Sequence, residues 1–145
     1  MRIVMASDHG GLELRRMVFE HVQERGYEVV DLGTHEDASV DYPDYAVMAV
    51  EKMRSGEADR AVLVCGTGLG ISMAANRHKG IRAALCHNEF EARMSRQHND
   101  ANVLVLGGRI IGPGLAASIF DAWMGAEFEG GRHANRVEKI ESIEG

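Results

Sequence analysis

Residues 62–72 read VLVCGTGLGIS, and this stretch combines three features that favour one kind of fold. An apolar, β-branched run ends at Cys65, a loop with alternating glycines follows, and an apolar segment then indicates the start of a helix. Open parallel α/β sheets bind their ligands at the carboxyl ends of the strands. Gly66, Gly68 and Gly70 let backbone N–H groups approach an anionic oxygen, with a helix N-terminus behind them. The stretch therefore predicts a strand–loop–helix unit that sets a thiol beside an oxyanion-binding loop.

Strand-like and helix-like segments alternate on both sides of this stretch. Short apolar runs predict five strands, at residues 3–6, 28–32, 60–65, 82–86 and 103–106. Segments with helical character follow them, at residues 12–25, 42–55, 69–77, 89–98 and 114–124. Repeated strand–helix units of this kind predict an α/β fold, a Rossmann-like three-layer α/β/α sandwich with a five-stranded, mainly parallel sheet.

The C-terminal segment departs from this alternation. After Gly130 and Gly131 the chain has helical character again, but no strand follows it. Its apolar residues are few, namely Val137, Ile140 and Ile143. We therefore expect residues 130–145 to form an extra helix that packs on a partner subunit.

Composition limits the class of protein. The 145 residues suit one domain spanning 1–145, and the net charge of −6 argues against a nucleic-acid-binding surface. The first eight residues lack signal-peptide organisation, and no apolar run reaches membrane-spanning length. Two cysteines give neither a disulfide framework nor a repeated metal-ligand pair. We expect a reduced cytoplasmic protein with no metal, no cofactor, and neither nucleic acid nor membrane as a partner.

Cys65 is the candidate reactive group, because the loop and the helix N-terminus that follow it favour its thiolate form. The alternative is a small buried hydrophobe, which is our interpretation of Cys86. These residues alone leave open whether Cys65 acts as a nucleophile or as a base. The glycine loop lacks both the dinucleotide spacing and the lysine of a triphosphate loop, so oxyanion binding is favoured over a simple packing turn. Thr67 either donates a hydrogen bond to a ligand or caps the next helix.

Other polar residues are predicted at the same edge of the sheet. Asp8 and His9 follow the first predicted strand, and Arg109 follows the fifth. Asp8 suits a substrate hydroxyl and His9 a phosphate, although Asp8 alternatively only caps the first helix. Tyr42 stands between Asp41 and a proline and completes this set, with a place in the core as its alternative.

Two further groups lie later in the chain. Arg132 and Arg136 share one face of a helix, close to the N-terminus where the dipole disfavours cations. An anion such as phosphate bound between them would offset this unfavourable position. The alternative is that both arginines lie on a solvated face and pair with Glu138. His98 and Asn99 follow the fourth predicted helix, where a histidine can titrate near neutral pH.

Taken together, these motifs resemble the ribose-5-phosphate isomerase B family, part of a wider group that includes galactose-6-phosphate and allose-6-phosphate isomerases. The resemblance covers essentially the whole chain. It rests on residues 7–11 (SDHGG), 41–43 (DYP), 65–70 (CGTGLG), 98–99 (HN) and the pair Arg132 and Arg136. It implies reversible isomerisation of ribose 5-phosphate and ribulose 5-phosphate through a cis-enediolate, without a cofactor.

The resemblance also implies roles for these residues. Cys65 would be the base that moves a proton between C1 and C2, and the backbone of residues 66–70 would stabilise the enediolate oxygen. Thr67 would assist proton movement, and His98 would assist opening of the sugar ring. Substrate binding would involve Asp8, His9, Tyr42, Gly66, Gly68, Gly70, Asn99, Arg109, Arg132 and Arg136.

A homodimer whose sites combine residues of two subunits is a further implication. Asn99 and the C-terminal arginines are the candidates to cross over, and a dimer of dimers is the larger alternative. A six-carbon sugar 6-phosphate is the alternative substrate. A non-catalytic phosphosugar- or nucleotide-binding regulator is the alternative from another class, but it leaves Cys65 unexplained.

Overall fold

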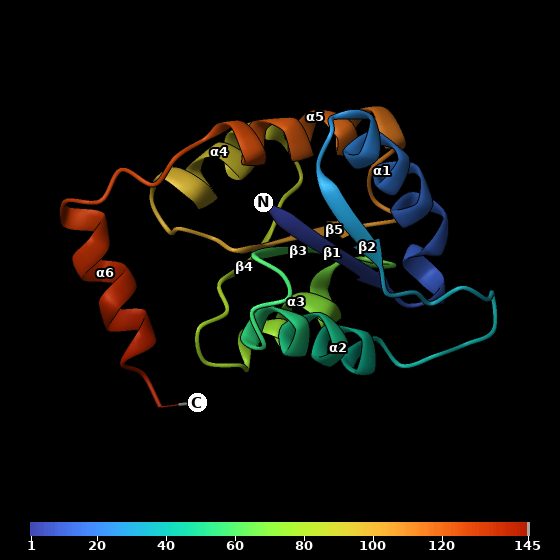
Figure 1. The fold of residues 1–145 in the computed structure, drawn as a ribbon, viewed down its shortest axis with the longest axis horizontal. Helices are drawn as coiled ribbons and strands as arrows, with labels where there is room; N and C mark the ends of the chain where they lie inside the picture. Colours follow the sequence, from blue (N-terminus) through green and yellow to red (C-terminus); the bar gives the residue numbers. More distant parts are fainter. Residues whose placement is uncertain (145) are drawn as a thin grey trace.

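A five-stranded, wholly parallel sheet forms the middle layer of the protein (Figure 1). The computed structural model describes residues 1–144; Gly145, the last residue of the expected C-terminal helix segment, lies outside the described residues. The strands are β1 (Arg2–Ser7), β2 (Glu28–Asp31), β3 (Arg60–Cys65), β4 (Ala83–Leu85) and β5 (Val103–Gly107). They lie in the order β2-β1-β3-β5-β4, so the predicted five-stranded parallel sheet is confirmed. Its two edge strands are β2 and the three-residue β4.

Helices cover both faces of this sheet. They are α1 (Leu12–Glu24), α2 (Tyr42–Arg54), α3 (Leu69–Asn76), α4 (Glu89–Gln97), α5 (Pro113–Gly125) and α6 (Arg132–Glu141), with a 3₁₀ turn η1 (His9–Gly11) before α1. In Figure 1, α1, α4 and α5 lie above the sheet, α2 and α3 lie below it, and α6 stands apart at the left. The predicted three layers and the extra C-terminal helix are therefore present.

Alternation along the strands creates two cores. On β3, Val62 and Val64 face α1, α4 and α5, where Phe120 and Trp123 are fully buried. Leu63 and its neighbours two residues away face the opposite side, against apolar residues of α2 and α3. Because successive side chains of a strand point to opposite faces, one apolar run supplies both cores.

The strand order explains which face each helix covers. Connections between parallel strands are right-handed, so the direction of a crossover fixes the side of its helix. The crossovers from β1 to β2 and from β4 to β5 run one way across the sheet and carry α1 and α4 on one face. Those from β2 to β3 and from β3 to β4 run the other way and carry α2 and α3 on the opposite face. The connections that leave the adjacent strands β1 and β3 therefore run to opposite sides of the sheet. Sheets of this kind form a ligand crevice between two such strands, at their carboxyl ends.

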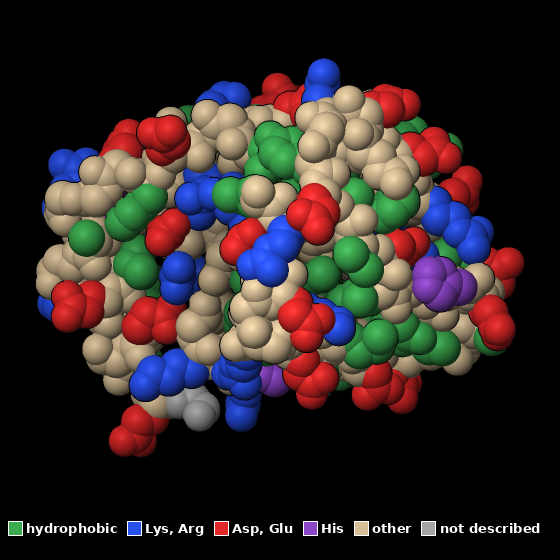
Figure 2. Space-filling model, viewed as in Figure 1, with side chains coloured by type: hydrophobic (Ala, Val, Ile, Leu, Met, Phe, Trp, Pro, Cys, Tyr) green, Lys and Arg blue, Asp and Glu red, His purple; other side chains and the backbone are tan. Residues whose placement is uncertain are grey.

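Helix α6 extends away from the sheet and its two layers (Figure 1). Hydrophobic side chains are visible on the surface over this part of the molecule (Figure 2), and Ile140 and Ile143 are 46% and 72% exposed. One polar anchor is formed by Glu141, which accepts hydrogen bonds from the Gly80 N–H (3.0 Å) and the Arg82 guanidinium. Among residues 1–144, none of the helices combines the length and apolar character needed to cross a bilayer.

Candidate active site

Three loops meet at the carboxyl edge of the sheet, after β1, β3 and β5. The Gly108 N–H donates to the Cys65 carbonyl and the Arg109 N–H donates to the Gly66 carbonyl, each over 2.8 Å. A Cβ at Gly108 would lie 2.8 Å from the Gly10 carbonyl oxygen. The loops therefore touch through their backbones, which only glycine at such positions permits.

The Cys65 side chain lies at the centre of this edge and is 4% exposed. Its Sγ accepts a hydrogen bond from the Gly68 N–H over 3.2 Å. Gly68 is the N-cap of α3 with a φ of +81°, and a side chain there would collide with Leu85. An N–H aimed at sulfur at a helix N-terminus stabilises negative charge on that sulfur. The loop geometry is therefore suited to a thiolate.

Thr67 lies within the cysteine loop, and Tyr42 packs beside that loop. Thr67 is exposed, and its Oγ1 accepts the Leu69 N–H over 3.2 Å, which is a helix-capping contact. The Thr67 hydroxyl hydrogen stays available, so this contact is compatible with both interpretations of the residue. The Tyr42 ring packs directly on α3, because a Cβ at Gly70 would lie 2.5 Å from the ring Cζ. Tyr42 itself is 39% exposed, so it lies at the rim of the loop and not in the core.

Asp8 and His9 stand at the start of η1. Asp8 is 7% exposed, and its Oδ1 accepts the Gly11 N–H over 3.1 Å, so it caps this 3₁₀ turn, whereas the N-cap of α1 itself is Gly11. His9 Nδ1 accepts the Val40 N–H over 3.2 Å, which leaves the ring proton of neutral His9 on Nε2. His9 and Arg109 both line a cavity of about 550 Å³ at this edge.

A buried ion pair supports the loop after β1. Arg15 is fully buried, its guanidinium donates to Ser7 Oγ, and its Nη2 donates to Asp31 Oδ2 over 3.3 Å. Arg15 Nε also lies 3.0 Å from Asp31 Oδ1, without hydrogen-bond alignment. Burial lowers the pKa of Arg15, and the carboxylate of Asp31 opposes that shift. This pair joins the ends of β1 and β2 behind the site.

The remaining predicted residues lie at the opposite edge of the sheet. Helix α4 runs back from the carboxyl end of β4, so that His98 caps its C-terminus and Asn99 lies shortly before β5 begins. Helix α6, which carries Arg132 and Arg136, follows α5 at the same amino-terminal edge (Figure 1). One chain therefore does not bring these four residues to Cys65.

His98 belongs to a polar cluster that the sequence did not reveal. Its ring stacks on His133, with centroids 4.2 Å apart and planes at 10°. Glu129 Oε1 lies 3.9 Å from His98 Nε2 and 3.6 Å from His133 Nε2. Burial lowers the pKa of His133, the charges of His98 and Arg132 act in the same direction, and Glu129 opposes them. Glu129 and His133 are four residues apart, but two intervening glycines hide the helical spacing that would have signalled the pair.

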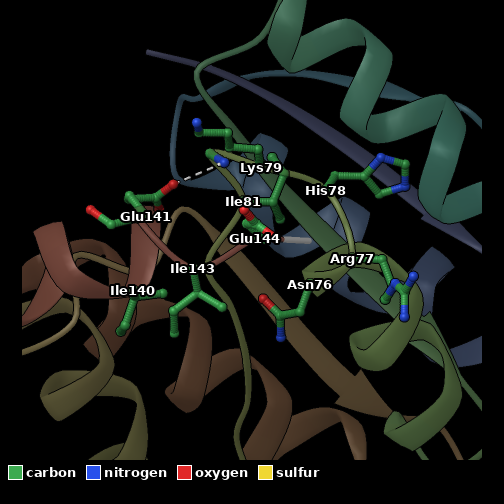
Figure 3. Close-up of a pocket in the computed structure, with 11 residues that line it drawn as sticks. Asn76, Arg77, His78, Lys79, Ile81, Ile140, Glu141, Ile143 and Glu144 are labelled. Atoms are coloured by element: carbon green, nitrogen blue, oxygen red, sulfur yellow. Dashed lines mark hydrogen bonds between the residues drawn. The ribbon is translucent and has the colours of Figure 1, made fainter.

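Arg132 and Arg136 are both exposed. In the part of the chain that the structure describes, neither forms a salt bridge, so the alternative pairing with Glu138 is not formed. The same end of the molecule contains a cavity of about 910 Å³, between α6 and the connection from α3 to β4 (Figure 3). Arg77, Lys79 and Ile140 are among its lining residues, and none of the predicted site residues is. We therefore assign the candidate site to the three loops and not to this larger cavity.

Comparisons with known proteins agree with the fold and with the family that the sequence resembles. Residues 3–140 match the ribose/galactose isomerase family. The chain is 49% identical to ribose-5-phosphate isomerase B of Escherichia coli, over 99% of this chain and 96% of that protein.

Two solved structures are also similar. Ribose-5-phosphate isomerase B of Clostridium thermocellum has a TM-score of 0.97 and 57% identity, over 99% of this chain and 97% of that one. The Mycoplasma genitalium protein of the same name, solved with bound ribulose-5-phosphate, has a TM-score of 0.91 and 44% identity, over 97% and 93% of the two chains. This chain belongs to the ribose/galactose isomerase family.

Proposed function

We propose that the protein is an aldose–ketose isomerase that interconverts D-ribose 5-phosphate and D-ribulose 5-phosphate. The observation that carries this proposal is the Mycoplasma genitalium structure, a full-length relative with one of these two sugars bound. The relatives from Escherichia coli and Clostridium thermocellum bear the same enzyme name. Nothing in the site favours a six-carbon sugar phosphate or a regulator without activity over this substrate.

Cys65 is the base in this proposal. Its thiolate removes the C2 proton of the open-chain aldose, the C1 carbonyl oxygen becomes the enediolate oxygen, and the proton returns to C1 to give the ketose. The hydrogen bond from the Gly68 N–H to Sγ supports the assignment, because it stabilises the thiolate before the reaction. Cys86 is a poor alternative, since it is 1% exposed and burial raises the pKa of its thiol to about 12.

The enediolate oxygen binds at the N-terminus of α3, in the segment from Gly66 to Gly70. First-turn N–H groups of a helix have no intrahelical acceptor; those of Gly68 and Leu69 already donate to Cys65 Sγ and Thr67 Oγ1, so the N–H groups of Gly70 and Ile71 are the ones left for an oxyanion. The Thr67 hydroxyl hydrogen assists transfer between the two substrate oxygens. Asp8 and Tyr42 lie on either side of the loop, where they position the sugar.

The phosphate and the closed sugar ring are bound with the help of a second copy of the chain. In this proposal the protein is a homodimer, and His98, Asn99, Arg132 and Arg136 of one copy reach the Cys65 edge of the other. His98 assists ring opening, while His9 and Arg109 hold the phosphate together with the two crossing arginines. Two observations support this: the crossing residues lie at the wrong edge of their own sheet, and both arginines are exposed. The extended position of α6 also fits a helix that packs on a partner (Figure 1).

The same proposal covers the organisation of the chain. It forms one catalytic domain, needs no cofactor because isomerisation involves no net redox change or hydrolysis, and works in the cytoplasm. Both cysteines are free, which fits a reducing compartment.

Turnover of ribose 5-phosphate by metal-free protein tests the assignment of Cys65. The C65A variant is expected to lose activity while it still binds the sugar phosphate, whereas C86A, which removes the other buried thiol, keeps activity. Allose 6-phosphate and galactose 6-phosphate serve as competing substrates in the same assay. Preferred turnover of a hexose phosphate would overturn the substrate, and full activity of C65A would overturn the base.

Mixing two inactive variants tests the shared site. Random reassociation of C65A and H98N chains should restore about a quarter of wild-type activity, because half of the dimers are mixed and each contains one intact site of two. No recovery from dimers shown to exchange subunits would contradict a site built from two chains.

A further inference from the structure

We propose that His98, Glu129 and His133 form a binding site for a divalent transition-metal ion of the Zn²⁺ class. The three residues come from the end of α4, the α5–α6 connection and the first turn of α6. One ligand atom of each, two imidazole nitrogens and a carboxylate oxygen, lies within 4.8 Å of the other two. Two imidazole nitrogens and one carboxylate bind Zn²⁺ or Co²⁺ better than Mg²⁺ or Ca²⁺, which take mainly oxygen ligands.

The separations between these atoms match the size of an ion. A tetrahedral ion with ligand bonds of about 2.0–2.1 Å keeps its donor atoms about 3.4 Å apart. Glu129 Oε1 lies 3.6 Å from His133 Nε2 and 3.9 Å from His98 Nε2, too far for a hydrogen bond in either case. The two Glu129 separations therefore need to contract by only about 0.2–0.5 Å, and the His98 ring must also move before the three donors can share one ion.

Backbone contacts hold two of the three ligands in position. The Glu129 N–H donates to the Gln97 carbonyl over 3.0 Å, which ties the α5–α6 connection to the end of α4. The His133 N–H donates to the Gly130 carbonyl over the same distance, and His133 is 7% exposed. His98 is the adjustable member of the set, with a side chain that is 39% exposed.

One rearrangement accompanies binding. The two imidazole planes are nearly parallel, so their nitrogen lone pairs do not converge on a single point. The exposed His98 ring has to tilt off His133, and metal binding therefore ends the stacking. The neighbouring charges of Arg132 and Arg136 oppose a cation, so the fourth position suits an anion such as chloride or phosphate.

A functional consequence rests on the proposed function. The ion takes up the lone pair of His98 Nε2, and that residue is the one assigned to ring opening. A bound ion is therefore an inhibitor that competes with the sugar phosphate, and it is not a cofactor of the reaction.

Direct titration of metal-free, full-length protein tests the site independently of activity. Calorimetry with Zn²⁺ should give one ion per chain, and Co²⁺ should give the strong visible absorption of tetrahedral coordination. E129Q and H133Q should each weaken Zn²⁺ binding at least about tenfold, since even the loss of an outer contact costs 10–100-fold. H87Q is the matched control, because His87 pairs with Glu91 at 3.3 Å on the surface and belongs to no group of three ligands among residues 1–144.

The outcomes separate this inference from the proposed function. Equal Zn²⁺ affinity in the wild type, E129Q and H133Q, or no binding at all, would overturn the metal site even if the protein isomerises ribose 5-phosphate. Loss of affinity in both variants, with unchanged circular dichroism, supports the site even if no sugar phosphate is turned over. If the protein is active, E129Q should keep its basal rate and lose inhibition by Zn²⁺.

Discussion

A methyl group at Gly70 should disable the site without weakening the fold. A Cβ there would lie 2.5 Å from Cζ and 2.7 Å from Cε1 of Tyr42. Ordinary carbon–carbon contacts are about 3.5–4.0 Å, so the ring must retreat by about 1 Å. Tyr42 is partly exposed and free to do so. Because a displacement of about 1 Å in a binding group can cost about 10²-fold in rate, we expect G70A to lower kcat/KM by about 10²-fold.

The free energy of unfolding of G70A should rise slightly or stay unchanged, although its kcat/KM falls. Gly70 is the second residue of α3, and alanine is favoured over glycine in a helix by about 1 kcal/mol. G114A is the matched control, since Gly114 is the second residue of α5 and a Cβ there meets nothing within 4 Å. G114A should keep its activity, and its free energy of unfolding should stay unchanged or rise by up to about 1 kcal/mol.

An alanine at Gly11 should instead weaken the fold. A Cβ at Gly11 would lie 2.5 Å from the carbonyl oxygen of Val64, in the backbone of the central strand β3, which cannot move aside. G11A should therefore lower the free energy of unfolding by about 1–3 kcal/mol. Steady-state kinetics and urea unfolding of the three variants distinguish the effects. Near wild-type kcat/KM in a folded G70A protein would refute the placement of Tyr42 beside the substrate, and a destabilised G70A would refute the packing argument.

Two further predictions concern buried and paired charges. R15M should destabilise the protein by about 1–3 kcal/mol in urea unfolding, because Asp31 loses its cationic partner but keeps the Gly33 N–H and some contact with solvent, and an unchanged free energy of unfolding would contradict a structural role for this pair. Desolvation raises the pKa of Asp121, but hydrogen bonds from Arg25 and His21 outweigh it, so the pKa is lowered. The Asp121 carboxylate therefore stabilises the folded state fully above the ordinary Asp pKa. This stabilisation is lost as the pH falls through the lowered folded-state pKa. The difference in unfolding free energy between the wild type and D121N should shrink over that acidic range, and a constant difference would show that the carboxylate is not stabilised by folding.

Local sequence patterns determined the architecture and the chemistry of the cysteine loop. Apolar runs of strand length, alternating with segments of helical period, predicted the five strands and the layers, because burial of one face imposes its period on each segment. The alternating glycines predicted a close-packed loop, and the structure shows why they are needed: Gly68, the N-cap of α3, has a positive φ, and Gly70 makes room for Tyr42. These features depend on neighbours in the chain and can be read from it directly.

Only the tertiary structure decided which residues meet. The order β2-β1-β3-β5-β4 follows from long-range packing, and it places β4 at one side of the sheet, with α4 between β4 and β5. The same packing brings His98 onto His133 and beside Glu129, which lie 35 and 31 positions later in the chain and carry no periodic signal. Sequence periods report which face of a segment is buried, but contacts between distant segments depend on where the whole chain turns, and that is fixed by the packing of all the layers together.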